Sequence, residues 1–191
     1  MSKIKIAGVD EVGRGAWAGP MVASAVIFKG KIDFELKDSK ALTFDQRKEL
    51  AVKIKKVAYW SIGVVSHFEI DKFGLQRANI MVAERAVAGL PIKPSSLKLD
   101  MIRGFSHSLP FELIIRGDSK ILEIMAASII AKDHRDNMMI ELDKHYKQYS
   151  FSAHKGYGTK LHQDMLAKHG VSVLHRTSYI PIKEYIKVNK N

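Results

Sequence analysis

The 191-residue sequence contains no cysteine. This excludes disulfide bonds, thiolate nucleophiles and cysteine-ligated zinc, so any metal site must rest on carboxylates and histidines. No stretch reaches the roughly 18 uninterrupted apolar residues of a membrane-spanning helix. The first residues also lack the apolar core and small-residue cleavage site of a secretory signal. We therefore expect a soluble, cytoplasmic protein built as one domain, or as one domain with a small appendage.

Acidic residues are scarce relative to basic ones. The chain has 31 Lys and Arg against 20 Asp and Glu, which gives a net charge of +11. With 46% hydrophobic and 27% charged residues, its composition is that of a folded protein rather than a disordered one. An excess of positive charge attracts polyanions, and nucleic acid is the commonest of these. A lysine-rich surface without any polyanionic partner explains the charge equally well, so charge alone leaves both interpretations open.

The hydrophobic pattern alternates between the periods of strands and helices along the chain. Strands are predicted for residues 4–9, 20–28, 58–65, 97–100 and 113–116. Helices are predicted after Thr43, over 67–88 with a break near Gly74, and over 120–146, 159–169 and 181–188. This order predicts an α/β fold with a mixed five-stranded sheet and a small helical C-terminal segment. The composition changes after Tyr149, so we place a catalytic domain at 1–150 and the C-terminal segment at 151–191.

Acidic side chains follow three of the predicted strands. Asp10 and Glu11 come after the first strand, Asp100 after the fourth and Asp118 after the fifth. Acids are depleted within strands, but at strand ends they can converge on one edge of a sheet. Four such carboxylates would repel one another unless a hard cation lay between them. Mg²⁺ and Mn²⁺ prefer oxygen ligands, so the pattern predicts a site for such an ion.

Each acid also has an ordinary structural explanation. Asp118 could cap the helix that follows it, Asp100 could begin a turn, and the Asp10-Glu11 pair could lie in a solvated turn. The glycines of Gly13–Gly19 follow a strand, as in a dinucleotide-binding turn. Such a turn should open a helix, however, and here another strand follows.

Six motifs occur in the order seen in type 2 ribonucleases H. They are GVDEVGRGAWAGPMVASAV from residue 8, DSKALT at 38–43, LKLD at 97–100, RGDSKILEIMAASIIAKDHRD at 116–136, HKGYGT at 154–159 and HRTSYIP at 175–181. Over nearly its whole length the chain resembles the bacterial ribonuclease HII family. The family has Gly where this chain has Met101, and Pro where it has Ala16, so the backbone of these two loops is expected to differ.

The resemblance implies a ribonuclease H-like fold and a metal-dependent endonuclease. Such an enzyme would cut the RNA strand of RNA–DNA hybrids and single ribonucleotides embedded in duplex DNA, leaving 5′-phosphate and 3′-hydroxyl ends. Two divalent ions, Mn²⁺ or Mg²⁺, would assist the hydrolysis. The implied catalytic and metal-binding residues are Asp10, Glu11, Asp100 and Asp118. The implied substrate-binding residues are Gly13, Arg14, Gly15, Lys40 and Tyr157.

Further expectations concern the histidines, a reserve acid and the biological role of the protein. His154 and His175 lie in the matching motifs and are expected to be structural or near the substrate, whereas the other histidines are expected to have no special role. Asp136 is a reserve candidate for the fourth acid. We expect a monomer that acts in ribonucleotide excision repair and DNA replication. The alternatives are a related nuclease that cuts DNA alone and a basic nucleic-acid-binding protein without catalysis.

Overall fold

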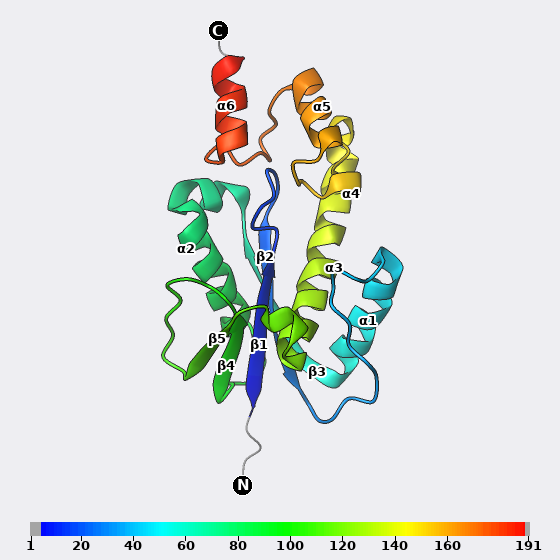
Figure 1. Cartoon of the computed structure of the whole chain (residues 1–191), viewed down its shortest axis with the longest axis vertical. Coiled ribbons are helices and arrows are strands. Elements are labelled where there is room, and N and C mark those ends of the chain that lie inside the picture. The colour runs from blue at the N-terminus through cyan, green and yellow to red at the C-terminus, as the bar shows by residue number, and fades with distance from the viewer. Residues whose placement is uncertain (1–4, 190–191) are drawn as a thin grey trace.

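The computed structural model describes residues 5–189, and its centre is a five-stranded mixed sheet (Figure 1). The strand order is β3-β2-β1-β4-β5. The strands are β1 (Ile6–Val12), β2 (Met21–Phe28), β3 (Ala58–Val65), β4 (Ser96–Asp100) and β5 (Phe111–Ile114). The first three pair antiparallel, whereas β4 and β5 run parallel to β1. The predicted α/β class and the mixed five-stranded sheet are confirmed.

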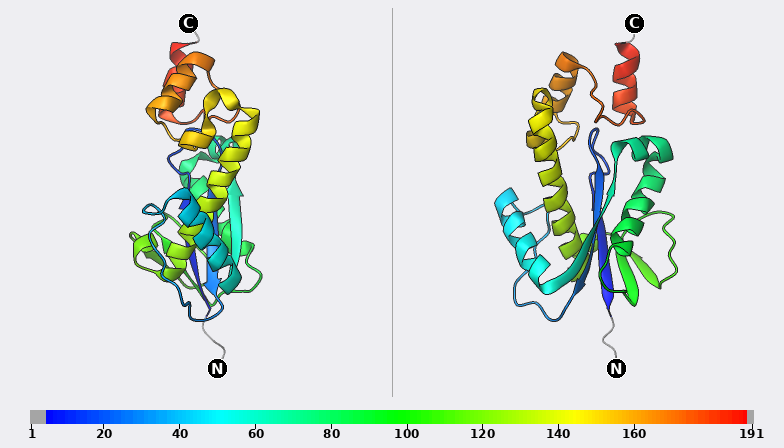
Figure 2. Two further views of the ribbon diagram at one scale, coloured as in Figure 1. Left: turned by 90° about the vertical axis from the view of Figure 1, so that its right-hand side faces the viewer. Right: turned by 180° about the vertical axis from the view of Figure 1, so that it is seen from behind.

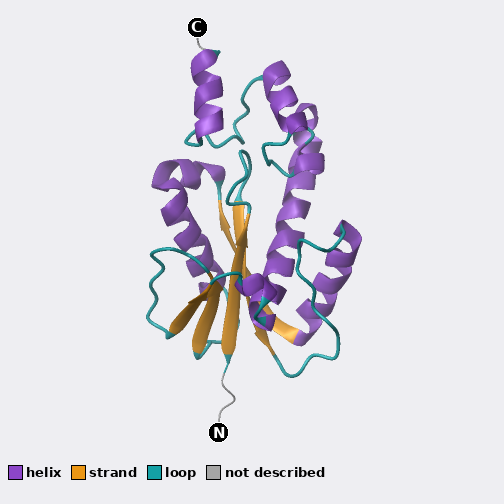
Figure 3. Cartoon of the chain, in the orientation of Figure 1, coloured by secondary structure: helices purple, strands orange, loops and turns teal. Residues whose placement is uncertain are grey.

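Helices cover both faces of the sheet, as the edge-on views show (Figure 3 and the right view of Figure 2). One face is covered by α2, and the other by α3 with α1 packed against it. The helical elements are α1 (Phe44–Val57), α2 (His67–Ala88), η1 (Gly117–Ser119), α3 (Leu122–His145), η2 (Lys147–Tyr149), α4 (Phe151–His154), α5 (Lys160–His169) and α6 (Ile180–Val188). In the part of the chain that the structure describes, no helix is both long and apolar enough to cross a membrane.

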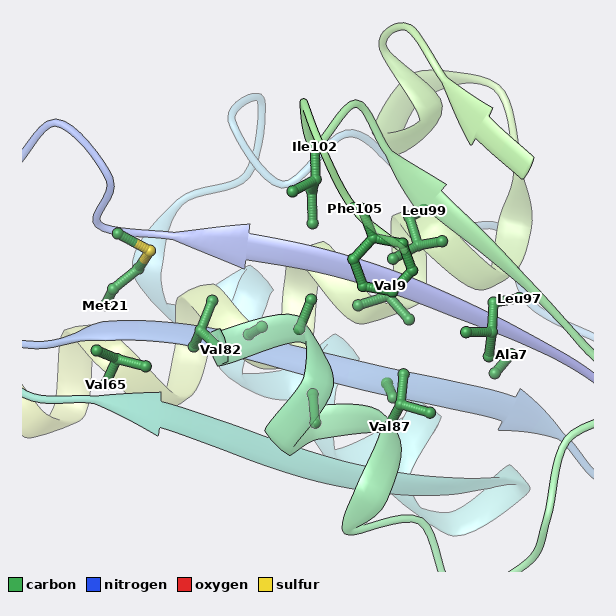
Figure 4. Close-up of a cluster of buried hydrophobic side chains, with 14 of the residues drawn as sticks. Ala7, Val9, Met21, Val65, Val82, Val87, Leu97, Leu99, Ile102 and Phe105 are labelled. Atoms are coloured by element: carbon green, nitrogen blue, oxygen red, sulfur yellow. The ribbon is translucent and has the colours of Figure 1, made fainter. Parts of the chain in front are cut away.

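The two faces of the sheet have separate hydrophobic cores. Ala7 and Val9 of β1 and Leu97 and Leu99 of β4 belong to one core with Val82 and Val87 of α2 (Figure 4). The second core lies between the sheet, α1 and α3. Because strand side chains alternate between faces, the residues of β1 with even numbers point toward α3. This alternation decides where the acids of β1 point.

Local signals set the helix boundaries as predicted. The hydroxyl of Thr43 accepts a hydrogen bond from Gln46 N, and the Gln46 side chain accepts one from Thr43 N, which forms a capping box at α1. Ser66 and Glu69 do the same at α2. Gly74 interrupts α2 with a φ of 80°, so the predicted break is confirmed.

Two strand predictions need correction. The first strand does not stop before the acids: β1 continues to Val12, so Asp10 and Glu11 lie within it and pair with Ser24 and Ala23 of β2. Ile4, the first residue of that predicted strand, is outside the described residues. The fifth strand ends at Ile114, and Asp118 lies beyond it in η1. Asp118 does not cap α3, because Ile121 occupies the N-cap position, so that alternative is wrong.

The C-terminal segment lies beyond the end of the sheet that the β1–β2 turn reaches (Figures 1 and 2). Backbone hydrogen bonds join the two: Arg176 N donates to Trp17 O at 2.7 Å, and Gly19 N donates to Leu174 O at 2.9 Å. The carboxylate of Asp71 in α2 also accepts hydrogen bonds from the backbone and hydroxyl groups of Thr177 and Ser178. A domain boundary near residue 150 stays a prediction.

Candidate active site

A cavity of about 500 Å³ opens at the carboxyl ends of β1 and β4. This edge of the sheet is where α/β folds bind their ligands. The lining comes from both strands, from the loop before α1, and from α1, η1, α3 and the segment after α4. The lining residues are Asp10, Glu11, Val12, Ser39, Lys40, Arg47, Asp100, Asp118, Ser128, Lys132 and Tyr157. The fold therefore brings all four predicted acids together with Lys40 and Tyr157.

The sheet register explains why the cavity exists. β1 pairs with β4 only as far as Val9 opposite Leu99, while its pairing with β2 continues to Val12. The last three residues of β1 therefore have one edge without a neighbouring strand. Asp10 points to the α3 side of this free edge and Glu11 to the α2 side. Acids in the middle of a strand are accommodated here because the strand next to them has ended.

The other two acids are fixed by contacts from distant parts of the chain. Asp100 ends β4, and its Oδ1 accepts a hydrogen bond from Gly117 N at 2.9 Å. Asp118, on the following residue, is buried, and its Oδ2 lies 2.7 Å from Lys40 Nζ. The hydrogen bond to Asp118 raises the pKa of the Lys40 ammonium. The loop before α1, which contains the DSKALT motif, thus places the Lys40 ammonium against Asp118.

Burial and mutual repulsion act together on the acids of β1. Burial raises the pKa of Asp10 well above its usual range, and the charges of Glu11, Asp100 and Asp118 raise it further. Burial also raises the pKa of Glu11; Asp100 adds to this effect, whereas the guanidinium of Arg14 opposes it. Both carboxylates are thus destabilised in their ionised forms. A bound cation would reverse this, because it stabilises the ionised state.

The donor set fits a hard divalent cation. All four acids offer oxygen ligands, and among the described residues no histidine lines the cavity. Glu11 Oε2 is buried and has no hydrogen-bond partner among those residues, so one carboxylate oxygen lacks the partner that burial requires. As the side chains lie, no group of three or more acids or histidines within residues 5–189 is arranged to hold an ion. Lys40 provides the positive charge at Asp118.

The cationic side chains Lys132 and Arg47 also line the cavity, which sequence reasoning missed. Lys132 on α3 pairs with Asp136 one turn later at 2.7 Å, and Arg47 of α1 approaches the same carboxylate at 3.1 Å. Asp136, the reserve candidate, is therefore committed to two ion pairs and does not line the cavity. The i, i+4 spacing of Lys132 and Asp136 predicts their helical ion pair from the sequence, and the structure confirms it. The contact with Arg47 spans 89 residues and left no signal in the sequence.

Tyr157 lies beside Lys132 in the lining of the cavity. Its half-buried ring has Lys132 Nζ 5.7 Å and the Arg135 guanidinium 5.3 Å from its centre. Gly13 comes directly after the last residue of β1 and has a φ of 87°. A Cβ on Gly13 would lie 2.1 Å from Arg135 Nε. Only glycine fits that position. Arg135 therefore contacts both elements that were predicted to bind substrate, although none of Gly13, Arg14 and Gly15 lines the cavity itself.

The two departures from the family pattern cause no strain. Met101 is 42% exposed and is not among the residues with positive φ, so its side chain is accommodated after Asp100. Ala16 is fully buried, and its N–H donates to Gly13 O at 3.3 Å. A proline could not make that bond. The turn that contains Gly13 is therefore closed by a hydrogen bond in place of a rigid ring.

Comparison with known proteins decides the family. The sequence model of one family, Ribonuclease HII, matches residues 7–182. The chain belongs to the ribonuclease HII family. It is 44% identical to a ribonuclease HII of Alteromonas mediterranea over 95% of this chain and 97% of that one. It is also 42% identical to a ribonuclease HII of Rhizorhabdus wittichii over 95% of this chain and 91% of that one.

Solved structures agree with this assignment. The ribonuclease H2 of Pyrococcus horikoshii OT3 superimposes with a TM-score of 0.83 at 25% identity, over 98% of this chain and all of that one. Bst-RNase HIII, solved in complex with Mn²⁺, shares the fold with a TM-score of 0.74 at 17% identity, over 98% of this chain and 70% of that one. The expected ribonuclease H-like fold is confirmed. This ribonuclease HII family member is a ribonuclease H hydrolase, and the alternative of a protein without catalysis is wrong.

Proposed function

We propose that the protein cuts the RNA strand of RNA–DNA hybrids and also cleaves at single ribonucleotides within duplex DNA, leaving 5′-phosphate and 3′-hydroxyl ends. The observation that supports this most directly is the cavity at the end of β1, where four acids face Lys40 and Lys132. A carboxylate wall suits divalent ions, and a cationic wall suits the phosphates on either side of the cut. Asp10, Glu11, Asp100 and Asp118 are the residues we assign to catalysis.

The four acids would hold two divalent ions, Mg²⁺ or Mn²⁺. Bound there, such ions supply an activated water and charge relief at the phosphate and at the leaving oxygen. The residues of the chain hold the site in place. Asp10 is fixed within a paired strand and Asp100 by Gly117 N, whereas Asp118 is paired with Lys40, which a bound ion would replace. Once Lys40 leaves Asp118, its ammonium is free to contact a substrate phosphate.

The ribose would be recognised on the other side of the cavity. An enzyme that distinguishes RNA from DNA must test the 2′-hydroxyl group. The backbone of Gly13, Arg14 and Gly15 can approach a sugar closely, and Tyr157 carries a hydroxyl and a flat ring at the cavity wall. Buried arginines hold both elements, because Arg176 donates to Arg14 O and Arg135 donates to Lys155 O, two residues before Tyr157. Elements that are held in this way suit the recognition of a ribose, because ribose and deoxyribose differ only in the oxygen of the 2′-hydroxyl group.

The decisive assay uses a DNA duplex with one ribonucleotide beside the all-DNA duplex. We expect cutting of the first only, with activity lost in EDTA and restored by Mg²⁺ or Mn²⁺. The ends of the product are identified by ligation and by phosphatase treatment. Cutting of the all-DNA duplex at a similar rate would identify a nuclease of the DNA-specific class. Cutting that persists in EDTA would contradict the assignment of the four acids.

Tyr157 can be tested by two substitutions. Tyr157→Phe removes the hydroxyl, and an unmade buried hydrogen bond costs about 1–3 kcal/mol. Tyr157→Ala also removes the ring, so we expect a larger loss. The loss should be greater on a single ribonucleotide than on a long hybrid, where neighbouring contacts compensate. The ratio of the two cleavage rates is measured together with thermal unfolding. A folded Tyr157→Ala protein that keeps both rates would show that Tyr157 only packs. The control is Tyr59→Phe, which removes a tyrosine hydroxyl at the far end of the sheet and should leave both rates unchanged.

Binding should depend steeply on salt. Each phosphate contact by Lys or Arg releases condensed cations, so the logarithm of the affinity falls linearly with the logarithm of the salt concentration. If Lys40 contacts a phosphate, Lys40→Gln should reduce this slope by about 0.9. Lys93→Gln, just before β4 and at the opposite end of that strand from Asp100, should not change it. Titrations of a labelled hybrid in Ca²⁺ measure the slopes, and a flat plot would mean that the charge of +11 is unrelated to binding.

The biological setting follows from these substrates. RNA–DNA hybrids and ribonucleotide-containing duplexes are products of DNA replication, and removal of ribonucleotides is a step of excision repair. A cytoplasmic, monomeric enzyme would suit this role. Gel filtration with light scattering tests the monomer.

A further inference from the structure

Three buried histidines lie together between α4, α5 and the loop before α6. The rings of His154 and His162 stack with centres 4.2 Å apart, and the ring of His175 lies 5.2 Å from that of His162. Each ring is at most 7% exposed. Burial lowers the pKa of His162 and of His175 to about 4, so both are neutral at pH 7. From the sequence, His162 was expected to have no special role.

Hydrogen bonds fix which nitrogen of each ring carries the proton. Ser172 N, which can only donate, lies 2.9 Å from His175 Nδ1, and the Ser172 hydroxyl lies 2.8 Å from the same atom. His175 Nδ1 is therefore an acceptor, and the proton of this neutral ring is on Nε2. The carbonyl of Ser172 is farther away, at 3.3 Å, and a proton on Nδ1 would point at the Ser172 N–H group. The geometry leaves one tautomer for His175.

The second ring must then have the opposite tautomer. His175 Nε2 lies 3.0 Å from His162 Nε2, so His175 donates and His162 accepts. The proton of His162 is consequently on Nδ1, which lies 3.0 Å from the carbonyl oxygen of Tyr157. A single chain of hydrogen bonds thus runs from Ser172 through His175 and His162 to the backbone of Tyr157.

The same histidine is joined to the β1–β2 turn. The backbone of His175 forms a β-bridge with Ala18, and its neighbours Leu174 and Arg176 exchange hydrogen bonds with Gly19 and Trp17. His175 therefore contacts one candidate ribose-binding element through its backbone. It reaches the other, Tyr157, through its side chain and His162. The turn also bonds directly to the residue before Tyr157, because Trp17 N donates to Gly156 O at 2.8 Å. The imidazole pair adds a second connection between the two elements, and this one ends on the carbonyl of Tyr157 itself.

We infer that His162 and His175 are positioning residues that hold Tyr157 at a fixed distance from the Gly13–Gly19 turn, and thereby set how well the enzyme recognises a ribose. This inference rests on the proposed role of Tyr157. Neither histidine lines the cavity, so both act through the backbone of Tyr157 and not on the substrate. Because both rings are neutral and have opposite tautomers, they can connect the two elements through hydrogen bonds without placing a charge in the interior.

The tautomers can be observed directly in the unmodified protein. Long-range ¹H–¹⁵N spectra of histidine-labelled protein at pH 7 distinguish Nδ1–H from Nε2–H. We expect Nδ1–H for His162 and Nε2–H for His175. His154 serves as an internal reference for Nε2–H, because its Nδ1 accepts a hydrogen bond from Gly156 N at 3.1 Å. The same tautomer on His162 and His175, or exchange between tautomers, would overturn the chain whatever the substrate.

A double-mutant cycle tests whether the pair acts through Tyr157. His162→Phe keeps a ring in the cluster but removes both hydrogen bonds. We expect cleavage of the single-ribonucleotide duplex to fall about 10- to 100-fold, since small misplacements are costly. In a Tyr157→Ala background the same change should cost less than about twofold, because the residue that it positions is gone. His162→Gln, which can still donate and accept, should recover part of the activity, and His169→Phe on the same helix should match the wild type.

The outcomes separate the inference from the proposed function. If folded Tyr157→Ala cleaves as the wild type does, the role of Tyr157 is wrong, and this inference falls with it. If Tyr157→Ala is impaired but the effect of His162→Phe is undiminished in that background, only the positioning role is wrong. Near-wild-type cleavage by His162→Phe in a Tyr157-dependent enzyme would also overturn it. Circular dichroism and thermal unfolding establish that each variant is folded.

Discussion

Asp10→Asn is expected to abolish cleavage while leaving substrate binding within a few-fold of the wild type. A carboxylate that would hold the divalent ions contributes several kcal/mol to catalysis, which corresponds to at least about a thousandfold in rate. Binding depends mainly on the basic surface and should survive. Single-turnover rates and titrations in Ca²⁺ measure the two effects. Asp45→Asn, an exposed acid in the first turn of α1, is the matched control and should cleave normally.

The same substitution should stabilise the metal-free protein. Burial and the neighbouring acids raise the pKa of Asp10, so its ionised form is less favourable in the folded than in the unfolded chain. A group with a raised pKa favours folding at low pH and loses that contribution as the pH rises through the folded-state value. Asparagine removes the charge, so the unfolding temperature in EDTA should rise at pH 7. A lower unfolding temperature together with full activity would exclude Asp10 from the acidic group.

Arg176→Met is expected to lower both stability and cleavage. Arg176 is fully buried, and its guanidinium donates to Gly19 O at 2.9 and 3.0 Å and to Arg14 O at 3.1 Å. Methionine fills a similar volume but leaves the buried Gly19 O without these donors, whereas Arg14 O keeps a hydrogen bond from the Tyr179 hydroxyl. An unsatisfied buried group costs about 1–3 kcal/mol, so we expect a loss of about 1–3 kcal/mol in the free energy of unfolding.

Urea unfolding and cleavage rates test this prediction side by side. Arg77→Met removes a guanidinium that is 53% exposed and paired with Glu84, and such surface pairs contribute at most about 1 kcal/mol. Arg176→Lys keeps the charge but not the planar set of donors, and should recover only part of the loss. Stability of Arg176→Met within about 1 kcal/mol of the wild type would show that water or backbone rearrangement replaces the guanidinium.

The sequence by itself determined the elements of the fold and the chemistry of the site. Helical and alternating periods placed the helices and strands, since these patterns depend on neighbours within one or two turns. Thr43 and Gly74 marked a helix start and a break through purely local preferences. The four acids were recognisable from their positions after apolar runs and from the family motifs around them.

Only the tertiary structure decided how these parts meet. β1 carries its acids within the strand because β4 stops at Asp100, and that depends on the pairing of segments about 90 residues apart. Lys40 meets Asp118 across 78 residues, and Arg176 reaches Arg14 across 162. No periodicity records such contacts, because each follows from the packing of whole elements against one another. The identity of the acids is therefore local information, whereas their partners, their burial and their pKa values are properties of the folded chain.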